Sequence, residues 1–589
     1  MKLSDYVVDT IAKEGVSHVF EFIGGAIVHL LDSIAARDDI QCVSVRHEQA
    51  GAFAAEAYAR VNGNLGVAMA TSGPGALNLL TGIGSCFFDS VPCLFITGQV
   101  NTYEYKFDRS IRQIGFQETD IVSVAKPLTK HAELITDPLK IRYCLEKAIF
   151  LAKHGRPGPV LLDIPMNLQR ADINPTELES FFDSSEFKQL TFLNFISERT
   201  INDVVNLLAQ AKRPALLAGG GVRASYGTTA LDKFLEITGV PVVCSLMGID
   251  AISHQNPLYY GMIGSYGNRY SNLILANSDL LIVLGSRLDS RQTGTRPDTF
   301  AREATIIHVD IDDNELNAKV EADIAVKSDI RAFLDILNSS LENYEKPDLQ
   351  EWYRVIDIYR EKYPTYSAEQ KEDRIEPNRF IQHLSSVTPE GTAICLDVGQ
   401  HQMWASQSFK LKKNQRLLNS GGMGAMGFAL PAAIGAALVT NEDVVVIAGD
   451  GGIQVNIQEL DTIVRLKLPV KIFVLNNSSL GMVRQFQDIY FNGRQQSTIY
   501  NNPDFTKIAT SYGIPSYHIT TPEETSEILA TVFSTKGAVL VEVSLEQNTA
   551  VNPKLVVNRP IEDMYPFLSR EELQSVMKIN LVAEMDVPK

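Results

Sequence analysis

The chain has 589 residues, of which 45% are hydrophobic and 21% charged, and its formal net charge is −17. Its length predicts about three or four domains, and its acidic balance without a basic run disfavours binding to nucleic acid or to an anionic membrane. No apolar stretch reaches the roughly twenty residues that cross a bilayer, and no signal peptide is evident at the start of the sequence.

Two stretches, residues 170–190 and 342–377, interrupt the hydrophobic periodicity and are typical of connections between domains. They divide the chain into segments 1–170, 191–341 and 377–560, followed by a C-terminal tail, 561–589, that we expect either to fold over the site or to be mobile. Each segment alternates buried-type strands with helical patterns, which predicts an α/β protein of three doubly wound parallel-sheet domains. Six scattered cysteines without a CxxC pair disfavour a disulfide framework or structural zinc and fit the reducing cytoplasm.

In the first segment, a short strand ends near Arg46 and a helix rich in small residues follows from Ala50. Glu48 lies at this junction. Taken alone, it is an ordinary helix-start carboxylate, stabilised by about 0.3–1 kcal/mol through the helix dipole. A second strand, residues 66–70, leads into the glycine turn Thr71-Ser-Gly-Pro-Gly-Ala.

In the middle segment, two buried strands each lead into glycines. Residues 214–218 are followed by three glycines, and residues 280–284 are followed by Gly285-Ser-Arg287-Leu-Asp289-Ser-Arg291. Glycines let the backbone approach a phosphate, and arginine supplies bidentate charge. The pattern predicts a second nucleotide site; the alternative is an empty vestigial site in which the arginines are surface cations.

In the third segment, Gly449-Asp450-Gly451 follows a buried strand, and Asn476-Asn477 follows the next one after twenty-four intervening residues. The carboxyl ends of neighbouring strands in an open parallel sheet are where ligands bind. Asp450 and Asn477 carry the hard oxygen ligands that Mg²⁺ prefers, and the glycines admit a diphosphate. The segment therefore predicts a magnesium–diphosphate site.

A competing pattern lies just before this segment. Residues 422–427 satisfy G-x-G-x-x-G, with Asp450 about twenty residues further on, as in a nicotinamide-dinucleotide site. We expect residues 415–421 to form a poor strand, and Asp450 has its own glycines. A dehydrogenase therefore remains a minor alternative.

Several stretches together resemble one known family, the large catalytic subunit of acetolactate (acetohydroxyacid) synthase, which depends on thiamine diphosphate. The resemblance covers nearly the whole chain. The matching stretches are Arg46-His-Glu-Gln-Ala, Thr71-Ser-Gly-Pro-Gly-Ala, Phe116-Gln-Glu, Gly155-Arg-Pro-Gly-Pro-Val, Asp397-Val-Gly-Gln-His-Gln-Met-Trp, Gly421-Gly-Met-Gly-Ala-Met-Gly-Phe and the Gly-Asp-Gly and Asn-Asn pair. The three segments would then be the pyrimidine-binding, FAD-type and diphosphate-binding domains.

The resemblance also implies roles for individual residues. Glu48 would bond to the pyrimidine of the cofactor and promote its imino tautomer, and Gln117 would reach the reacting centre. The implied metal ligands are Asp450, Asn477 and Ser479. The implied cofactor contacts are Pro74, Asn78, Gly399, Gln400, His401, Gly424, Met426, Gly449, Gly451, Gly452, Gly481 and Met482. The implied substrate contacts are Gly25, Phe116, Lys130 and Phe486.

For the middle segment, the resemblance implies FAD without a redox role. Its contacts would be Arg156, Gly219, Gly220, Gly221, Ser245, Leu246, Gly285, Arg287, Asp289, Arg291, Asp310 and Asp329. The family relation also implies a homodimer or homotetramer with active sites at the dimer interface, while any regulatory subunit remains open.

The implied reaction is decarboxylation of pyruvate and transfer of the two-carbon unit to an acceptor carbonyl. No histidine lies between His47 and His131, which disfavours simple release of an aldehyde. Three features depart from the family and would line the acceptor side: Phe486 in place of tryptophan, a long loop between residues 100 and 116 with Lys106, Arg109 and Arg112, and the turn of residues 21–25.

Two acceptors are consistent with these departures. One gives ordinary acetolactate, and the other is a larger or anionic ketone such as a nucleotide-linked keto-deoxysugar. A non-catalytic cofactor-binding paralogue is the alternative from another class. The intact Glu48, Asp450 and Asn477 count against it.

Overall fold

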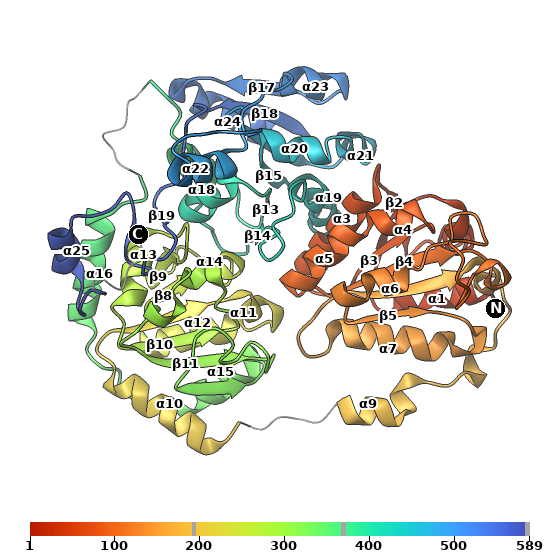
Figure 1. Ribbon diagram of the computed structural model, residues 1–589, viewed down its shortest axis with the longest axis horizontal. Coiled ribbons are helices and arrows are strands. Elements are labelled where there is room, and N and C mark those ends of the chain that lie inside the picture. The colour runs from red at the N-terminus through yellow and green to blue at the C-terminus, as the bar shows by residue number, and fades with distance from the viewer. Residues whose placement is uncertain (191–195, 367–372, 583–589) are drawn as a thin grey trace.

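The computed structural model describes residues 1–190, 196–366 and 373–582. Outside it lie residues 191–195 at the start of the middle segment, residues 367–372 in the second connection and residues 583–589 at the end of the tail. Three six-stranded parallel sheets dominate the described chain and lie side by side in three groups of helices and strands (Figure 1). The predicted α/β class with three parallel-sheet domains is confirmed.

The N-terminal sheet has the strand order β2-β1-β3-β4-β6-β5. The middle strands are built from continuous apolar runs because helices cover both faces; all five residues of β3 are buried. The strands are β1 (His18–Phe22), β2 (Gln41–Ser44), β3 (Gly66–Ala70), β4 (Cys93–Gln99), β5 (His131–Leu134) and β6 (Val160–Pro165). The helices are α1 (Leu3–Lys13), α2 (Val28–Ala35), α3 (Glu48–Asn62), α4 (Pro74–Asn78), α5 (Leu80–Asp89), α6 (Ile121–Ala125), α7 (Ile141–Lys153) and α8 (Met166–Gln169), with α9 (Ser185–Leu190) after them.

The middle sheet has the order β12-β11-β10-β7-β8-β9. Its strands are β7 (Pro214–Ala218), β8 (Val242–Cys244), β9 (Tyr259–Met262), β10 (Leu280–Leu284), β11 (Thr305–Asp310) and β12 (Ile324–Lys327). Its helices are α10 (Glu198–Gln210), α11 (Gly220–Ala224), α12 (Thr228–Thr238), α13 (Arg269–Ala276), α14 (Ser290–Thr293), α15 (Ile330–Ser340) and α16 (Gln350–Lys362).

The C-terminal sheet has the order β14-β13-β15-β16-β18-β17. Its strands are β13 (Ala393–Leu396), β14 (Arg416–Leu418), β15 (Val444–Gly449), β16 (Val470–Asn476), β17 (Ser516–Ile519) and β18 (Val539–Ser544). Its helices are α17 (Pro377–Val387), α18 (Gln400–Ser408), α19 (Ala429–Thr440), α20 (Asp450–Val455), α21 (Glu459–Arg465), α22 (Gly481–Tyr490), α23 (Phe505–Ser511) and α24 (Thr525–Ser534). The short antiparallel pair β19 (Lys554–Leu555) and β20 (Met564–Tyr565) and helix α25 (Arg570–Val576) follow.

The first and third sheets share one topology. Numbered within each domain, both read 2-1-3-4-6-5, whereas the middle sheet reads 6-5-4-1-2-3. The likeness between the outer domains is therefore in strand order as well as in size.

Helices α3 and α19 join these two outer domains. Both are rich in alanine and glycine, so their backbones approach closely: a Cβ on Gly435 of α19 would lie 2.1 Å from the carbonyl oxygen of Ala54 in α3. The Phe53 and Phe428 rings also meet edge to face, with centroids 5.5 Å apart. One continuous apolar core runs through both domains as a result.

The segment 342–377, expected to be a connection, contains helix α16. Trp352, Ile356 and Tyr359 recur at helical spacing and are buried in a core of the middle domain. Its abundant charged residues hid this apolar stripe, which is the actual reason that a helix forms there.

In its described part, the tail after Pro560 packs on the middle domain and does not cover the predicted site. Ile561, Leu573 and Val576 are buried in the same core as α16, and Figure 1 shows α25 beside α16. The tail thus completes the middle domain.

The expectation of a poor strand at 415–421 is corrected in part, because residues 416–418 form β14 at the sheet edge. Asp450 follows β15, however, and β13 lies between β14 and β15. A dinucleotide site would need Asp450 at the end of the strand next to β14. Asp450 is not there, so the structure does not support the dinucleotide interpretation. In the described ranges, no helix has the length and apolarity that crossing a membrane needs.

Candidate functional site

Glu48 is the first residue of α3, at the carboxyl edge of the N-terminal sheet. Its side chain is 7% exposed, and its Oε2 accepts a 2.9 Å hydrogen bond from Asn78 Nδ2. A Cβ on Gly75 would lie 3.1 Å from Glu48 Oε1. The turn from Gly73 to Asn78, which includes Pro74 at the start of α4, therefore packs directly against this carboxylate.

Gln117 lies on the other side of the same turn. A Cβ on Gly73 would be 3.0 Å from both the Cβ and the carbonyl oxygen of Gln117, and Gln117 itself has φ of +66°. The strained backbone of a non-glycine residue here fits a functional position. Glu48, Pro74, Asn78 and Gln117 are thus brought together.

Two predicted substrate residues lie at this edge and face outward. Gly25 is exposed, and a Cβ on it would meet no atom within 4 Å, whereas its neighbour Gly24 packs on Thr71. Phe116 is 86% exposed. In contrast, Glu21 from the unusual turn is buried and bonded to the Ser44 hydroxyl, so it does not line the acceptor side.

Lys130 does not join this group. It precedes β5, and its backbone N–H donates to Pro159, which precedes β6, so it sits at the amino edge of the parallel sheet. Its ammonium donates to the carbonyls of His154 and Arg156 at 2.6 and 2.7 Å, and burial lowers its pKa to about 8. This placement, opposite to the Glu48 edge, does not fit the expected substrate contact.

Asp450 begins α20 at the carboxyl edge of the C-terminal sheet. Its carboxylate accepts hydrogen bonds from the Ser479 N–H at 3.2 Å and from Asn502 Nδ2 at 2.7 Å. The Tyr500 hydroxyl lies 3.2 Å away, and burial raises the pKa of Asp450. The hydroxyl of Ser479 is buried without a partner among the described residues.

Asn477 lies beside this carboxylate, at the end of the neighbouring strand. Its Nδ2 donates to Gln400 Oε1 at 2.9 Å, which leaves its amide oxygen as the candidate metal ligand. A Cβ on Gly481 would come within 1.8 Å of Gln400 Oε1. A side chain at position 481, where α22 starts, would therefore displace Gln400, and the helix N-terminus there favours an anion. Met482, next along, packs on the domain core.

His401 lies under the same site. A Cβ on Gly449 would be 2.7 Å from its Nδ1, and one on Gly399 would be 2.6 Å from its Cε1. Burial lowers the pKa of His401 to about 3, so the ring is neutral at pH 7. Its Nε2 is buried without a partner in the described chain, which fits a donor to a phosphate oxygen.

Asp397 holds the backbone near the remaining predicted cofactor residues, Gly424, Met426, Gly451 and Gly452. It accepts from the N–H groups of Gly427 and Ala429 at 3.0 and 3.1 Å, and burial raises its pKa to about 6. A Cβ on Gly452 would lie 2.4 Å from this carboxylate, and one on Gly451 would lie 3.4 Å from Met426. Gly424 has φ of +70°. The Asp450 group thus combines closely packed glycines with two polar atoms that have no partner among the described residues, which fits a metal-bound diphosphate.

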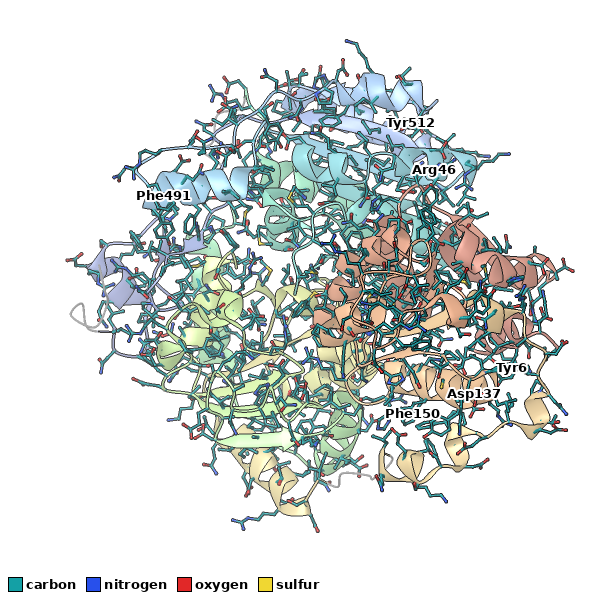
Figure 2. All side chains as sticks on the ribbon, turned by 45° about the vertical axis from the view of Figure 1, so that its right-hand side comes forward. Tyr6, Arg46, Asp137, Phe150, Phe491 and Tyr512 are labelled. Atoms are coloured by element: carbon teal, nitrogen blue, oxygen red, sulfur yellow. The ribbon has the colours of Figure 1, made fainter. Side chains whose placement is uncertain are left out.

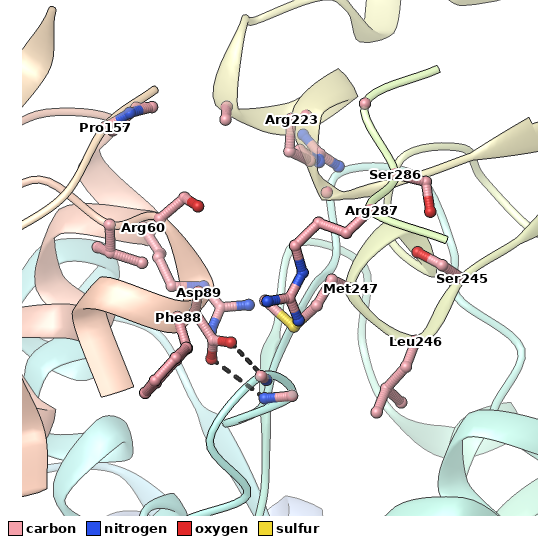
Figure 3. Close-up of a pocket in the computed structure, with 18 of the residues that line it drawn as sticks. Arg60, Phe88, Asp89, Pro157, Arg223, Ser245, Leu246, Met247, Ser286 and Arg287 are labelled. Atoms are coloured by element: carbon pink, nitrogen blue, oxygen red, sulfur yellow. Dashed lines mark hydrogen bonds between the residues drawn. The ribbon is translucent and has the colours of Figure 1, made fainter. Parts of the chain in front are cut away.

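A cavity of about 1090 Å³ lies where the three domains meet (Figure 3). The middle domain contributes the carboxyl edge of its sheet, and the N-terminal domain contributes its amino edge. Eleven of the twelve predicted FAD residues line it: Arg156, Gly220, Gly221, Ser245, Leu246, Gly285, Arg287, Asp289, Arg291, Asp310 and Asp329. Gly219 is the exception, because a Cβ there would lie 2.1 Å from the Gly285 carbonyl oxygen; packing explains this glycine.

Several polar residues of the cavity are already engaged by the protein. Arg156 pairs with Asp312 and Glu315 at 3.0 and 2.8 Å, which ties the first domain to the second. Asp289 and Asp329 accept backbone N–H bonds at the starts of α14 and α15. Of the two arginines from the Gly285 turn, Arg287 is half-buried and Arg291 is exposed.

Residues that were not predicted from the sequence close the cavity from the N-terminal side. Asp89 accepts from the N–H groups of Gly421 and Gly422 at 3.1 and 2.6 Å, and Arg60 donates to the Asn419 carbonyl at 2.7 Å. Figure 3 shows Arg60 and Asp89 across from Arg287. Tyr500 and Asn502 were missed as well, because they reach Asp450 from a loop without regular structure.

The Glu48 group and the Asp450 group remain separate in one chain. No hydrogen bond between described residues connects them. Close to Glu48, Arg46 links the two domains by bonding to Glu459 at 2.8 Å and to Asp461. Figure 2 shows Arg46 at this junction.

Three family models match this sequence. They describe the N-terminal TPP binding domain of thiamine pyrophosphate enzymes over residues 1–124, the central domain over 201–337, and the C-terminal TPP binding domain over 397–543.

Curated proteins match over nearly the full length. Acetolactate synthase 2, chloroplastic, of Nicotiana tabacum is 38% identical over 575 residues, covering 96% of this chain and 85% of that protein. The acetolactate synthase isozyme 2 large subunit of Escherichia coli K12 is 37% identical over 555 residues, covering 94% and 97%. The large subunit of Cyanidium caldarium is 36% identical over 546 residues, covering 91% and 92%.

Proposed function

Because this chain belongs to the acetolactate synthase large-subunit family of thiamine-diphosphate-dependent, C–C bond-forming enzymes, we propose that it decarboxylates pyruvate and transfers the two-carbon unit to an acceptor carbonyl. The observation that carries the proposal is the buried Glu48 carboxylate held by Asn78. The non-catalytic paralogue and the dehydrogenase are not favoured.

Glu48 would act on the cofactor rather than on the substrate. Bound thiamine diphosphate supplies a nucleophilic carbon that adds to a 2-keto acid and accepts the electrons released with CO₂. Glu48 would hold a proton at the pyrimidine nitrogen, Asn78 would fix the orientation of the carboxylate, and burial would exclude water from this proton.

The metal and diphosphate would be held by the other group. Asp450, the amide oxygen of Asn477 and the backbone of Ser479 would be ligands of Mg²⁺, which prefers oxygen. Neutral His401 would donate from its unpartnered Nε2 to a phosphate oxygen, and Gln400 would position Asn477.

The large cavity would bind FAD in a non-redox role. Its volume of about 1090 Å³ exceeds the range of drug-sized pockets, roughly 300–1,000 Å³, as a dinucleotide requires. Arg287 and the Gly220–Gly221 turn would bind its phosphates.

Two copies of the chain would complete each active site. Exposed apolar residues surround the Glu48 edge, namely Ile23, Leu77, Phe107, Ile111, Ile114 and Phe116. Others surround the Asp450 edge, namely Val455, Val483 and Phe486. Exposed apolar clusters of this kind mark interfaces, so a partner's diphosphate edge would cover the pyrimidine edge.

Acetolactate from a second pyruvate is the first candidate product. A larger anionic ketone is the second, favoured by the exposed Arg109 and Arg112 on the long loop beside Phe116. Product analysis by mass spectrometry, with pyruvate alone and with added ketones, distinguishes them.

The test of the proposal itself is CO₂ release from pyruvate with thiamine diphosphate and Mg²⁺. We expect release from wild type and a loss of about 100-fold or more in Glu48→Gln. Equal rates from both proteins would remove Glu48 from the mechanism, and no release from wild type would contradict the proposed function.

A further inference from the structure

Lys554 is a buried lysine whose ammonium has no hydrogen-bond acceptor among the described residues. It is 5% exposed, and three aromatic rings surround its Nζ. The ring centroids of Tyr490, Phe486 and Tyr266 lie 5.5, 5.6 and 5.8 Å away. Rings attract a cation but leave its three N–H donors unsatisfied, and an unsatisfied buried charge is costly.

The segment before Lys554 is tied to the diphosphate edge. The Thr549 carbonyl accepts from Gln400 at 3.0 Å and from Arg484 at 2.7 Å. Two residues further on, Val551 exchanges hydrogen bonds with Gln485 at 2.8 and 3.0 Å. Lys554 therefore lies along α22, the helix that begins at the candidate cofactor site and carries Phe486.

A second cation with free donors lies on the same helix. Arg484 is 2% exposed, and its Nε and one terminal nitrogen lack hydrogen-bond partners in the described chain. Its ion pair with Asp488 is long, at 3.6 Å. Arg484 and Phe486 are two positions apart on α22, so their side chains point to opposite faces of the helix. Arg484 therefore holds the segment around Thr549, and Lys554 is the cation on the Phe486 face.

We propose that Lys554 binds a negatively charged group of the acceptor and so determines acceptor specificity. The inference rests on the proposed carboligase function and adds a residue that selects the acceptor. Phe486 is 43% exposed and is one of the three rings around Lys554 Nζ, so the ammonium lies beside a ring that solvent reaches. The three unsatisfied N–H donors of Lys554 favour a phosphate over a carboxylate, because a phosphate carries more charge and more acceptor oxygens.

Three aldehydes of one shape test the proposal on the wild-type enzyme: benzaldehyde, 4-formylbenzoate and 4-formylphenyl phosphate. In each reaction, pyruvate loses CO₂, its acyl carbon bonds to the aldehyde carbon, and the aldehyde oxygen takes up a proton. We expect KM to fall about ten- to a hundredfold from the neutral aldehyde to the phosphate, as for hydrogen bonds to charged groups, with kcat changing little. A preference for the carboxylate alone would identify a second keto acid as the natural acceptor type.

The variant Lys554→Met keeps the length and apolar body of the side chain but removes the charge. We expect it to abolish the preference for the anionic aldehydes while CO₂ release and benzaldehyde turnover persist. Lys362→Met is the matched control, since Lys362 also lies over a ring, 5.4 Å from the Tyr363 centroid, and is on α16. Equal KM values for the three aldehydes in wild type, or an unchanged preference in Lys554→Met, would overturn the proposal.

Two further outcomes are distinguishable. If wild type releases no CO₂, the proposed function fails, and calorimetric binding of 4-formylphenyl phosphate to wild type and Lys554→Met then decides the anion site. If Lys554→Met does not fold, Lys554→Arg decides in its place: it keeps the charge, so retained preference supports the proposal and lost preference contradicts it.

Discussion

The walls of the large cavity come from all three domains of one chain, whereas Glu48 and Asp450 lie on two strand edges surrounded by exposed apolar side chains. Backbone packing of Gly219, Gly221 and Gly285 shapes the cavity before any ligand is present. At the Asp450 edge, by contrast, polar atoms of His401 and Ser479 have no partner among the described residues. A single chain forms the whole of the cavity, whereas the proposed active site would need both a cofactor and a second copy.

Mixing two inactive variants tests this contrast most sharply. Glu48→Gln and Asp450→Ala should each lack carboligase activity. If each site combines the two edges from different chains, refolding an equal mixture should restore about a quarter of wild-type activity, because half of random dimers then hold one intact site. Product formation from pyruvate measures it.

No recovery in this mixture, with dimers verified by light scattering, would place both residues of a site in one chain. Mixing either variant with itself is the control.

A side chain at position 481, at the start of α22, should affect the Asp450 group and leave the large cavity unchanged. In Gly481→Ala, the new Cβ would meet Gln400 Oε1 at 1.8 Å. Gln400 would have to break its bonds to Asn477 and Thr549, so we expect thiamine diphosphate to bind about ten- to a hundredfold more weakly. Calorimetric titration measures this.

Val483→Ala, an exposed position on the same helix, is the control for Gly481→Ala. Unchanged cofactor affinity in Gly481→Ala, or a matching loss of flavin, would show that the two sites are not independent.

The converse change belongs in the cavity. Gly285 has φ of +56°, and its Cβ would come within 2.5 Å of the Gly221 Cα. Gly285→Ala should therefore cost about 2–4 kcal/mol from backbone strain and overpacking together, and we expect a lower thermal midpoint and flavin loss in the purified protein.

Gly391→Ala separates these two contributions. Gly391 also has a positive φ, +77°, but nothing lies within 4 Å of its Cβ position, so only the conformational penalty of about 1 kcal/mol should appear. Equal midpoints for the two variants would remove the packing argument for the cavity.

Acid should lower the stability of the folded protein through His401, because burial lowers the pKa of this side chain to about 3. Above the ordinary pKa of about 6.5, the ring is neutral in both states and contributes nothing to pH dependence. Below it, the unfolded ring binds a proton that the folded ring refuses, so stability falls by about 2 kcal/mol by pH 5. The thermal midpoint of cofactor-free protein from pH 7 to 5 should fall less in His401→Gln, and parallel slopes would contradict this.

Much of the fold follows from local pattern. Continuous apolar runs at 66–70, 214–218 and 280–284 coincide with β3, β7 and β10. A strand that helices cover on both faces needs apolar side chains at successive positions. The helix at 350–362 was missed since charged residues outnumber its buried stripe, although Trp352, Ile356 and Tyr359 carry the helical period.

The Glu48 and Asp450 groups were predictable because their residues lie close after a strand. Asp450 and Asn477 follow β15 and β16, Glu48 begins the helix after β2, and all three lie at carboxyl edges. Lys130 precedes a strand and lies at the opposite edge. Asp89, Arg60 and Lys554 act across domain boundaries, and no local spacing in a single sequence encodes which distant backbone or ring they meet.

Helix α3 has one end at Glu48 and the other in the cavity wall, where Arg60 lies. Twelve residues separate the two, about 18 Å along the axis, and α19 packs tightly along the same helix. The helix is thus a stiff rod with a carboxylate at one tip and the cavity at the other. The FAD that we propose for this cavity would fix the position of that end of the helix without taking electrons, and this would be a mechanical reason to keep the cavity filled.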